Sequence, residues 1–141
     1  MLETIKQAAE NFCTHQIQEP CTIQDGTTQK RTLIAYIDIN TTDKTKYRVY
    51  LSADKEFMQK VAKLFLEEDE SDDETLQDMT LETANLIIGS AKVLAEDNEN
   101  AFTIETPKFV KDGSFDFPVD QAQTFKVGDA ELTLAIKELN A

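Results

Sequence analysis

The stretch DMTLETANLIIGSAK, from Asp78 to Lys92, reads as the middle of a long helix that packs into a core. When about 100° is allowed per residue, its polar residues share one arc of about 80°, and they are Asp78, Glu82, Asn85, Gly89, Lys92 and, just beyond the stretch, Glu96. The residues assigned to the apolar arc are Leu76, Met79, Thr80, Ala84, Leu86, Ile87, Ile88, Ala91, Val93, Leu94 and Ala95. The spacing predicts a helix over about residues 72–96, started by Ser71 or Asp72, that buries most of its circumference and exposes one polar ridge.

Three ridge residues stand out by their spacing. Glu82 and Asn85 are three residues apart, so their side chains are neighbours on a helix, with Cβ atoms about 5–6 Å apart. Gly89 lies one turn beyond Asn85, where glycine costs about 1 kcal/mol relative to alanine. Tight packing inside the protein would explain this glycine, and so would the close approach of another surface. Since any exposed helix face is polar, the spacing alone does not establish a functional site.

The segments on either side of this helix predict an α+β fold. Apolar residues recur at three- and four-residue steps over residues 2–17 and 54–67, which predicts two more helices, the second capped by Ser52 or Asp54. The apolar side of the second comprises Phe57, Met58, Val61, Leu64 and Phe65. Alternating residues predict strands at 30–40 and 46–51, paired as a hairpin, and at 101–105, 108–112, 115–119, 123–127 and 131–139. Because strands and helices do not alternate, we expect an antiparallel or mixed sheet with helices packed on it, in a single domain over residues 1–141.

The charge of the chain excludes several classes of partner. The formal net charge is −13, which argues against nucleic acid and against anionic membrane surfaces, since both are bound through lysine and arginine. Nine acids and no base lie between Glu67 and Glu82, and we interpret residues 67–78, the acidic segment, as a solvated loop and helix start. No apolar run approaches the roughly 18–20 residues of a membrane span, and the first residues lack the apolar region of a signal peptide, so a cytoplasmic location is expected.

The sequence contains no recognisable metal or nucleophile motif. Cys13 and Cys21 are not in a CxxC arrangement and are expected to be free thiols, with a disulfide the less favoured state. His15 is the only histidine, near the end of a helix, where its charge is favourable. We therefore expect no metal and no cofactor on this chain.

The quoted helix resembles the signature of the CheC/CheX/FliY family of chemotaxis phosphatases, Asp/Ser-x-x-x-Glu-x-x-Asn followed by a glycine and small residues. The matching positions are Asp78, Glu82 and Asn85, followed by Gly89, Ser90 and Ala91. The segments AAENFCTHQI, FTIETPKFVKDG and TFKVGDAELTLAI are also similar to the family's first helix and later strands. The predicted first helix has no second E-x-x-N, so the chain resembles single-motif CheX more than CheC. Leu86 stands where methionine is usual, and the acidic segment is longer and more charged than is typical of the family.

The resemblance implies a CheC-like fold and a partner, the phosphorylated CheY-type response regulator. In such a reaction Asn85 would orient the water that attacks the regulator's aspartyl phosphate, and Glu82 would pair with the regulator's lysine. Asp78 and Gly89 would assist docking, and Mg²⁺ would be held by the regulator. The resemblance also allows a homodimer formed through sheet edges. A non-catalytic adaptor for a response regulator, a chemotaxis enzyme or the flagellar switch is the alternative function.

Overall fold

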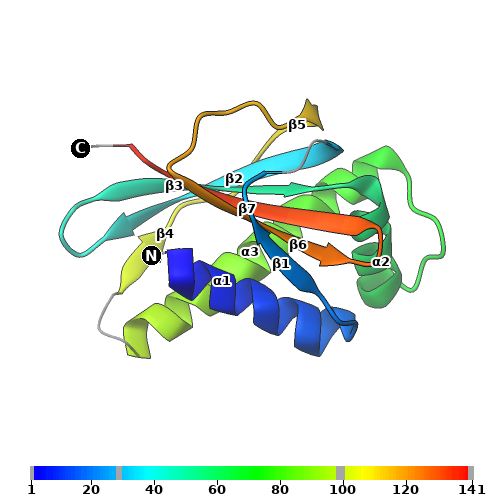
Figure 1. Cartoon of the computed structure of the whole chain (residues 1–141), viewed down its shortest axis with the longest axis horizontal. Coiled ribbons are helices and arrows are strands. Elements are labelled where there is room, and N and C mark those ends of the chain that lie inside the picture. Colours follow the sequence, from blue (N-terminus) through cyan, green and yellow to red (C-terminus); the bar gives the residue numbers. More distant parts are fainter. Residues whose placement is uncertain (1, 28–29, 98–100, 140–141) are drawn as a thin grey trace.

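The long helix predicted around the quoted stretch is present, and it crosses one face of an antiparallel sheet (Figure 1). The computed structural model describes residues 2–27, 30–97 and 101–139. Its helices are α1 (Leu2–Asn11), the π-helix η1 (Phe12–Ile17), α2 (Lys55–Leu66) and α3 (Asp73–Asp97). Its strands are β1 (Thr22–Asp25), β2 (Arg31–Thr41), β3 (Lys46–Ala53), β4 (Phe102–Ile104), β5 (Lys108–Ser114), β6 (Gln121–Val127) and β7 (Ala130–Glu138).

The strands form one sheet in the order β1-β6-β7-β3-β2. Both β4 and β5 pair with the side of β2 that faces away from β3. β4 pairs with the end of β2, for example Thr103 with Asn40, and β5 with its beginning, for example Gly113 with Thr32. Every pairing within the described ranges is antiparallel. The predicted α+β class is confirmed, as is the hairpin, in which Tyr36 of β2 lies opposite Tyr50 of β3.

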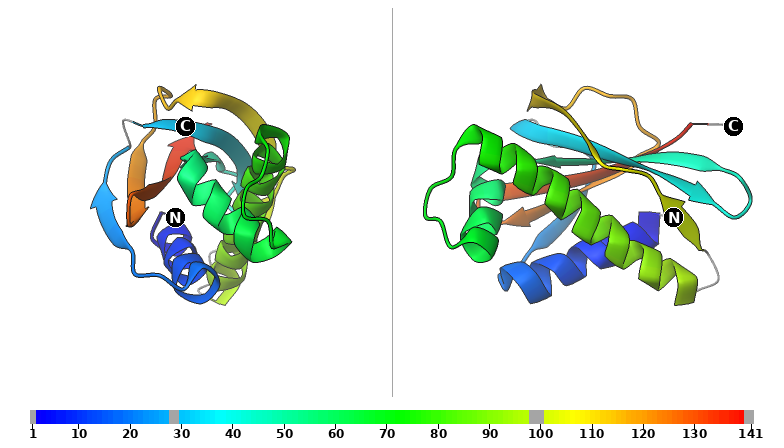
Figure 2. Two further views of the ribbon diagram at one scale, coloured as in Figure 1. Left: turned by 90° about the vertical axis from the view of Figure 1, so that its right-hand side faces the viewer. Right: turned by 180° about the vertical axis from the view of Figure 1, so that it is seen from behind.

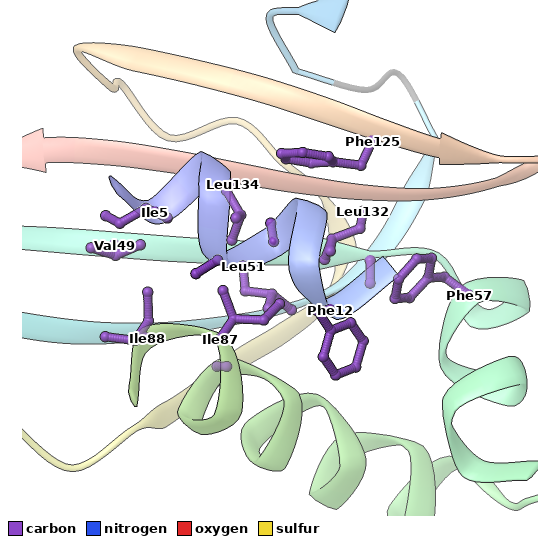
Figure 3. Close-up of a cluster of buried hydrophobic side chains, with 14 of the residues drawn as sticks. Ile5, Phe12, Val49, Leu51, Phe57, Ile87, Ile88, Phe125, Leu132 and Leu134 are labelled. Carbon is purple, nitrogen blue, oxygen red and sulfur yellow. The ribbon is translucent and has the colours of Figure 1, made fainter. Parts of the chain in front are cut away.

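The helices cover one face of the sheet, and a loop covers part of the other (Figure 2). Side chains alternate between the faces of a strand, so Leu33 and Ile37 of β2 point towards the helices while Ile34 points the other way. The main core lies between sheet and helices (Figure 3), and its labelled members are Ile5, Phe12, Val49, Leu51, Phe57, Ile87, Ile88, Phe125, Leu132 and Leu134. This packing holds α3 in place along its length.

Side-chain caps settle where α2 and α3 begin. Asp54, one of the two predicted caps, accepts the backbone N–H of Phe57 at 2.8 Å and that of Glu131 at 3.1 Å, which joins α2 to β7. Asp72 caps α3 by accepting the backbone N–H of Thr75 at 2.8 Å. Each cap satisfies an N–H that has no partner within its helix.

The predicted first helix over residues 2–17 is correct in extent but not uniform in geometry. Its last part, η1, is a π-helix, and the N–H of Gln18 donates to the carbonyl of Cys13 at 2.8 Å. An i→i+5 pattern brings residues five apart onto one face, so Phe12 and Ile17 are both buried.

The two cysteines are free, as expected, and differ in burial. Cys13 lies in the core, where burial, together with the nearby Cys21, raises its pKa to about 12. Cys13 is therefore a neutral thiol that packs as a small apolar residue.

One strand prediction is wrong, and one strand, β1, was not predicted. Residues 115–119 form no strand, and instead Phe115, Phe117 and Val119 pack over the outer face of the sheet, where the Phe117 ring stacks on Tyr50 with centroids 5.1 Å apart. The alternation of apolar residues over 115–119 reflects this packing, although the segment does not pair with a strand. Pro118 has no N–H to donate to a neighbouring strand. Conversely, β1 has four exposed residues and no alternation in burial, so its pairing with β6 had no hydrophobic signal.

Candidate functional site

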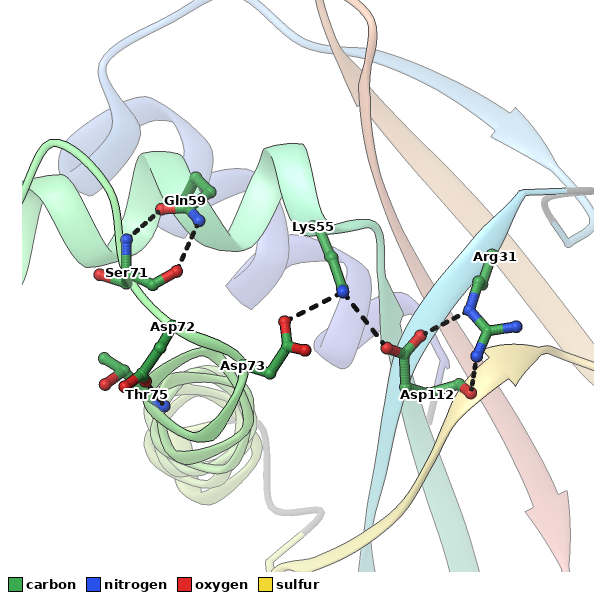
Figure 4. Close-up of polar contacts among 8 residues, drawn as sticks. All are labelled: Arg31, Lys55, Gln59, Ser71, Asp72, Asp73, Thr75 and Asp112. Atoms are coloured by element: carbon green, nitrogen blue, oxygen red, sulfur yellow. Dashed lines mark hydrogen bonds and ion pairs between the residues drawn. The ribbon is translucent and has the colours of Figure 1, made fainter.

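The start of α3 is tied to its neighbours by charged side chains (Figure 4). The Lys55 Nζ atom lies 3.0 Å from an oxygen of Asp73 and 3.6 Å from one of Asp112, and the other Asp112 oxygen lies 3.1 Å from Nε of Arg31. The hydrogen bond to Asp73 raises the pKa of Lys55. This chain of contacts connects α3 to α2, β5 and β2 at the end from which the ridge extends.

The acidic segment before α3 is also held by specific contacts. The Gln59 side chain donates to the carbonyl of Ser71 at 2.9 Å and accepts the Ser71 N–H at 3.0 Å, as Figure 4 shows. The Ser71 hydroxyl donates to Glu68 at 2.7 Å. Most carboxylates of this segment are exposed, as predicted for a solvated loop.

The core-facing side of α3 is fully packed. Its buried residues are Leu76, Met79, Thr80, Thr83, Ala84, Ile87, Ile88, Ala91 and Ala95. The buried hydroxyls of Thr80 and Thr83 each donate at 2.7 Å to the carbonyl four residues earlier. The core therefore holds α3 by its buried side, and the opposite side of the helix faces outwards.

The three motif residues lie on that opposite side. Asp78, Glu82 and Asn85 are all exposed, on the same face of one unbroken helix, so the predicted exposure of the ridge is observed. Within the described ranges, none of the three side chains makes a hydrogen bond or an ion pair. An uncommitted carboxamide next to an uncommitted carboxylate can accept and donate hydrogen bonds to an external group.

Gly89 is not required by packing inside the protein. A Cβ atom built at this position meets nothing within 4 Å. The first explanation offered by the sequence, tight internal packing, is therefore wrong. Because Gly89 has no side chain, the surface of α3 is lower at this position, one turn from Asn85.

Two residues assigned to the apolar arc belong to the exposed face instead. Leu86 is 41% exposed and Val93 is 59% exposed. On a helical wheel both angles fall within about 40° of Glu82, because Val93 is two turns from Leu86. Their residue type, not their angle, led to the wrong assignment. Leu64 and Phe65 of α2, also predicted to be on an apolar side, are 48% and 39% exposed.

Of these four side chains, Leu86 and Phe65 line a groove of about 360 Å³ between α1, η1, the end of α2 and the middle of α3. We call it the apolar groove after its apolar lining residues, Ala8, Phe12, Phe65, Leu86 and Ile87; its polar lining residues are Asn11, His15, Gln16 and Ser90. His15, exposed in η1, lines this groove and is not a ridge residue.

The described residues contain no group of three His, Cys, Asp or Glu side chains arranged to hold a metal ion. Across those same ranges, no helix is sufficiently long and apolar to span a membrane.

A family model identifies the family of the chain, and solved structures share its fold. The model of the family described as chemotaxis phosphatase CheX matches residues 35–127, well over half of the chain. No match was found among curated proteins. The crystal structure of chemotaxis protein CheX from Vibrio vulnificus aligns with a TM-score of 0.83 at 15% identity, covering 98% of both chains. CheX from Desulfovibrio desulfuricans aligns with a TM-score of 0.75 at 18% identity, covering 97% of both chains.

A third similar structure was solved with a partner. It is the CheX–CheY–BeF₃–Mg²⁺ complex from Borrelia burgdorferi, which aligns with a TM-score of 0.71 at 18% identity and covers 97% of both chains. At these identities the structural likeness concerns the fold.

Proposed function

Because the chain belongs to the CheX family of chemotaxis phosphatases, we propose that it hydrolyses the aspartyl phosphate of a CheY-type response regulator and so ends a chemotaxis signal. The observation that carries this proposal is the pair Glu82 and Asn85, exposed together on a rigid helix with no partner inside the described protein. The proposal treats residues 1–141 as one phosphatase domain.

Asn85 is the residue we assign to the attacking water. In the reaction the water oxygen forms a bond to phosphorus while the bond from phosphorus to the aspartate oxygen breaks, in line with the attack. The Asn85 carboxamide accepts a hydrogen bond from the water, and it carries no charge that would repel the phosphoryl group. Orientation of this kind matters, since a displacement of about 1 Å can cost about 100-fold in rate.

Three other ridge residues, Glu82, Asp78 and Gly89, serve docking in this proposal. Glu82 pairs with a lysine of the regulator and thereby sets Asn85 over the phosphoryl group. Asp78 lies one turn earlier on the same exposed face and assists the contact. Gly89 lets the regulator approach the helix backbone, which agrees with the open space around its Cα atom.

Mg²⁺ is assigned to the regulator. The similar complex from Borrelia burgdorferi combines CheX with CheY, BeF₃ and Mg²⁺. A metal on the regulator neutralises the charge that develops on the phosphoryl group, which leaves this chain to supply the water and the docking contact.

The charge of the chain bears on how tightly it binds. With a net charge of −13, long-range forces do not attract an anionic phosphorylated site, so affinity must come from local contacts. We expect a weak, transient complex. Dimerisation through a sheet edge stays a separate prediction, and β1 is one free edge of the sheet in the monomer.

Phosphate release tests the proposal. The protein is mixed with a phosphorylated CheY-type regulator and Mg²⁺, and release is followed for the wild type, Asn85→Ala and Glu82→Ala. We expect Asn85→Ala to lose about 100-fold or more in rate while keeping its affinity for the regulator. Glu82→Ala should lose both the rate of phosphate release and the affinity for the regulator.

Glu96→Ala is a matched control, because Glu96 is an exposed glutamate on the same helix, outside the Glu82–Asn85 pair. It should retain wild-type rates. Equal rates for Asn85→Ala, Glu82→Ala and the wild type would refute the catalytic role. Binding without any acceleration by the wild type would identify the protein as an adaptor.

A further inference from the structure

We propose that the apolar groove beside the ridge is a docking surface for the receiver domain of the phosphorylated regulator, an inference that rests on the proposed function. The regulator would cover two adjoining surfaces at once. The ridge would meet its phosphorylated site, and the groove would take an apolar part of the same domain.

The groove continues directly from the ridge. Leu86 lies four residues after Glu82, so the two side chains are neighbours on the helix surface, and Leu86 lines the groove together with Ser90. A protein placed over the Glu82 side chain therefore also reaches Leu86. Val93, two turns further along, extends the same exposed surface.

Five of the nine residues that line the groove are apolar, and the other four are Asn11, His15, Gln16 and Ser90. Phe65 stands half-exposed at the end of α2, with its ring centroid 6.4 Å from that of the buried Phe12. Ile87 also lines the groove and is fully buried. Leu86 and Phe65 are exposed large apolar side chains that line one groove, so a partner that covers both removes apolar surface from water.

The distribution of charge favours the regulator as the partner that binds in the groove. Acids are frequent on the flanking surfaces, in the acidic segment and at Asp78 and Glu82, yet no acid lines the groove. A partner with an anionic phosphoryl site is repelled by those flanks, whereas burial of apolar area contributes affinity without like-charge repulsion. A second copy of this chain would bring another ridge of acids against the first, so the regulator fits this surface better.

The test compares two leucines of equal exposure. Leu86 is 41% exposed in the groove, and Leu139 is 40% exposed after the end of β7, outside the groove lining. Binding of a regulator loaded with beryllium fluoride and Mg²⁺ is measured by titration for Leu86→Ser and Leu139→Ser. We expect Leu86→Ser to raise Kd by about tenfold, the effect of withdrawing most of one leucine from a buried contact, and Leu139→Ser to leave Kd unchanged.

Steady-state phosphate release separates docking from chemistry. Leu86→Ser should raise KM with kcat retained, whereas Asn85→Ala lowers kcat. Phe65→Ser, on the opposite element of the groove, should repeat the rise in Kd, and thermal melting confirms that each variant is folded. Because the groove contact is apolar, the ratio of mutant to wild-type Kd should stay the same between low and high salt.

Three results would overturn the inference. One is an unchanged Kd for both Leu86→Ser and Phe65→Ser. Another is a rise in Kd for Leu139→Ser that equals the rise for Leu86→Ser. The third is a wild-type dimer that Leu86→Ser dissociates without affecting regulator binding, which would assign the groove to a second copy. If the wild type binds the regulator but does not accelerate phosphate release, the proposed catalysis fails, while the Kd comparison still supports the docking surface.

Discussion

The first turn of α3 and its middle use the same kinds of polar residue in different ways. Asp72 accepts a backbone N–H at 2.8 Å, and Asp73 pairs with Lys55 at 3.0 Å. Glu82 and Asn85, about three turns later, have no partner within the described protein. The polar groups at the first turn hold the helix in place. Those at the ridge contribute no such contact, which is what is expected of residues that serve an external partner.

The largest effect we expect separates the buried side of α3 from the ridge. Ile87 has no exposed surface, so Ile87→Ala should lower the free energy of unfolding by about 2–5 kcal/mol through the cavity it creates. Asn85→Ala, only two residues away, should change it by no more than about 0.5 kcal/mol. Urea denaturation followed by circular dichroism measures both. A comparable loss in Asn85→Ala would mean that Asn85 has a structural role.

A smaller effect, of opposite sign, is expected at Gly89. Because an added Cβ meets nothing within 4 Å, Gly89→Ala should raise the free energy of unfolding by about 0.5–1 kcal/mol through helix propensity. The same change should weaken binding of the phosphorylated regulator, since a methyl group then stands where the partner approaches. Denaturation and titration of one preparation test both effects. A destabilised variant, or a stabilised one with unchanged affinity, would contradict the role given to this glycine.

The smallest effect concerns the cap of α3 and depends on pH. The N–H of Thr75 lowers the pKa of Asp72 below 3.8, its ordinary value. A depressed carboxyl pKa contributes stability that is present above the unfolded-state value and is lost as the pH falls through the folded-state value. Asp72→Asn keeps a capping oxygen but removes the charge. Its melting temperature should lie slightly below that of the wild type near neutral pH.

This difference should disappear as the pH falls below 3.8 and through the lowered folded-state pKa of Asp72. Melting curves recorded across this range test the prediction. A difference that persists or grows in acid would show that the charge of Asp72 is not what stabilises the cap.

The helices, the hairpin and the exposure of the motif could all be read from the sequence. Periodicity reports which side of an element is buried, and α3 buries one side strongly. The strands β2 and β3 bury residues on both faces and were recognisable as runs of apolar and aromatic residues. The motif followed from spacing, because residues three and four apart on a helix are neighbours whatever the rest of the fold does. Asp54 and Asp72 were each one of two predicted caps, and hydrogen bonds to Phe57 and Thr75 decided between the candidates.

Other features depend on contacts between distant segments, which no local pattern contains. Edge strand β1 exists because β6 supplies its hydrogen-bonding partner, and residues 115–119 are a loop because their aromatic rings pack on the outer face of the sheet. Leu86 and Phe65 are apolar by type, but their exposure depends on how closely α1, α2 and α3 approach one another. Burial is a property of the assembled packing, so local sequence set the positions of Glu82 and Asn85 on one helix face, and the meeting of three helices created the groove beside them.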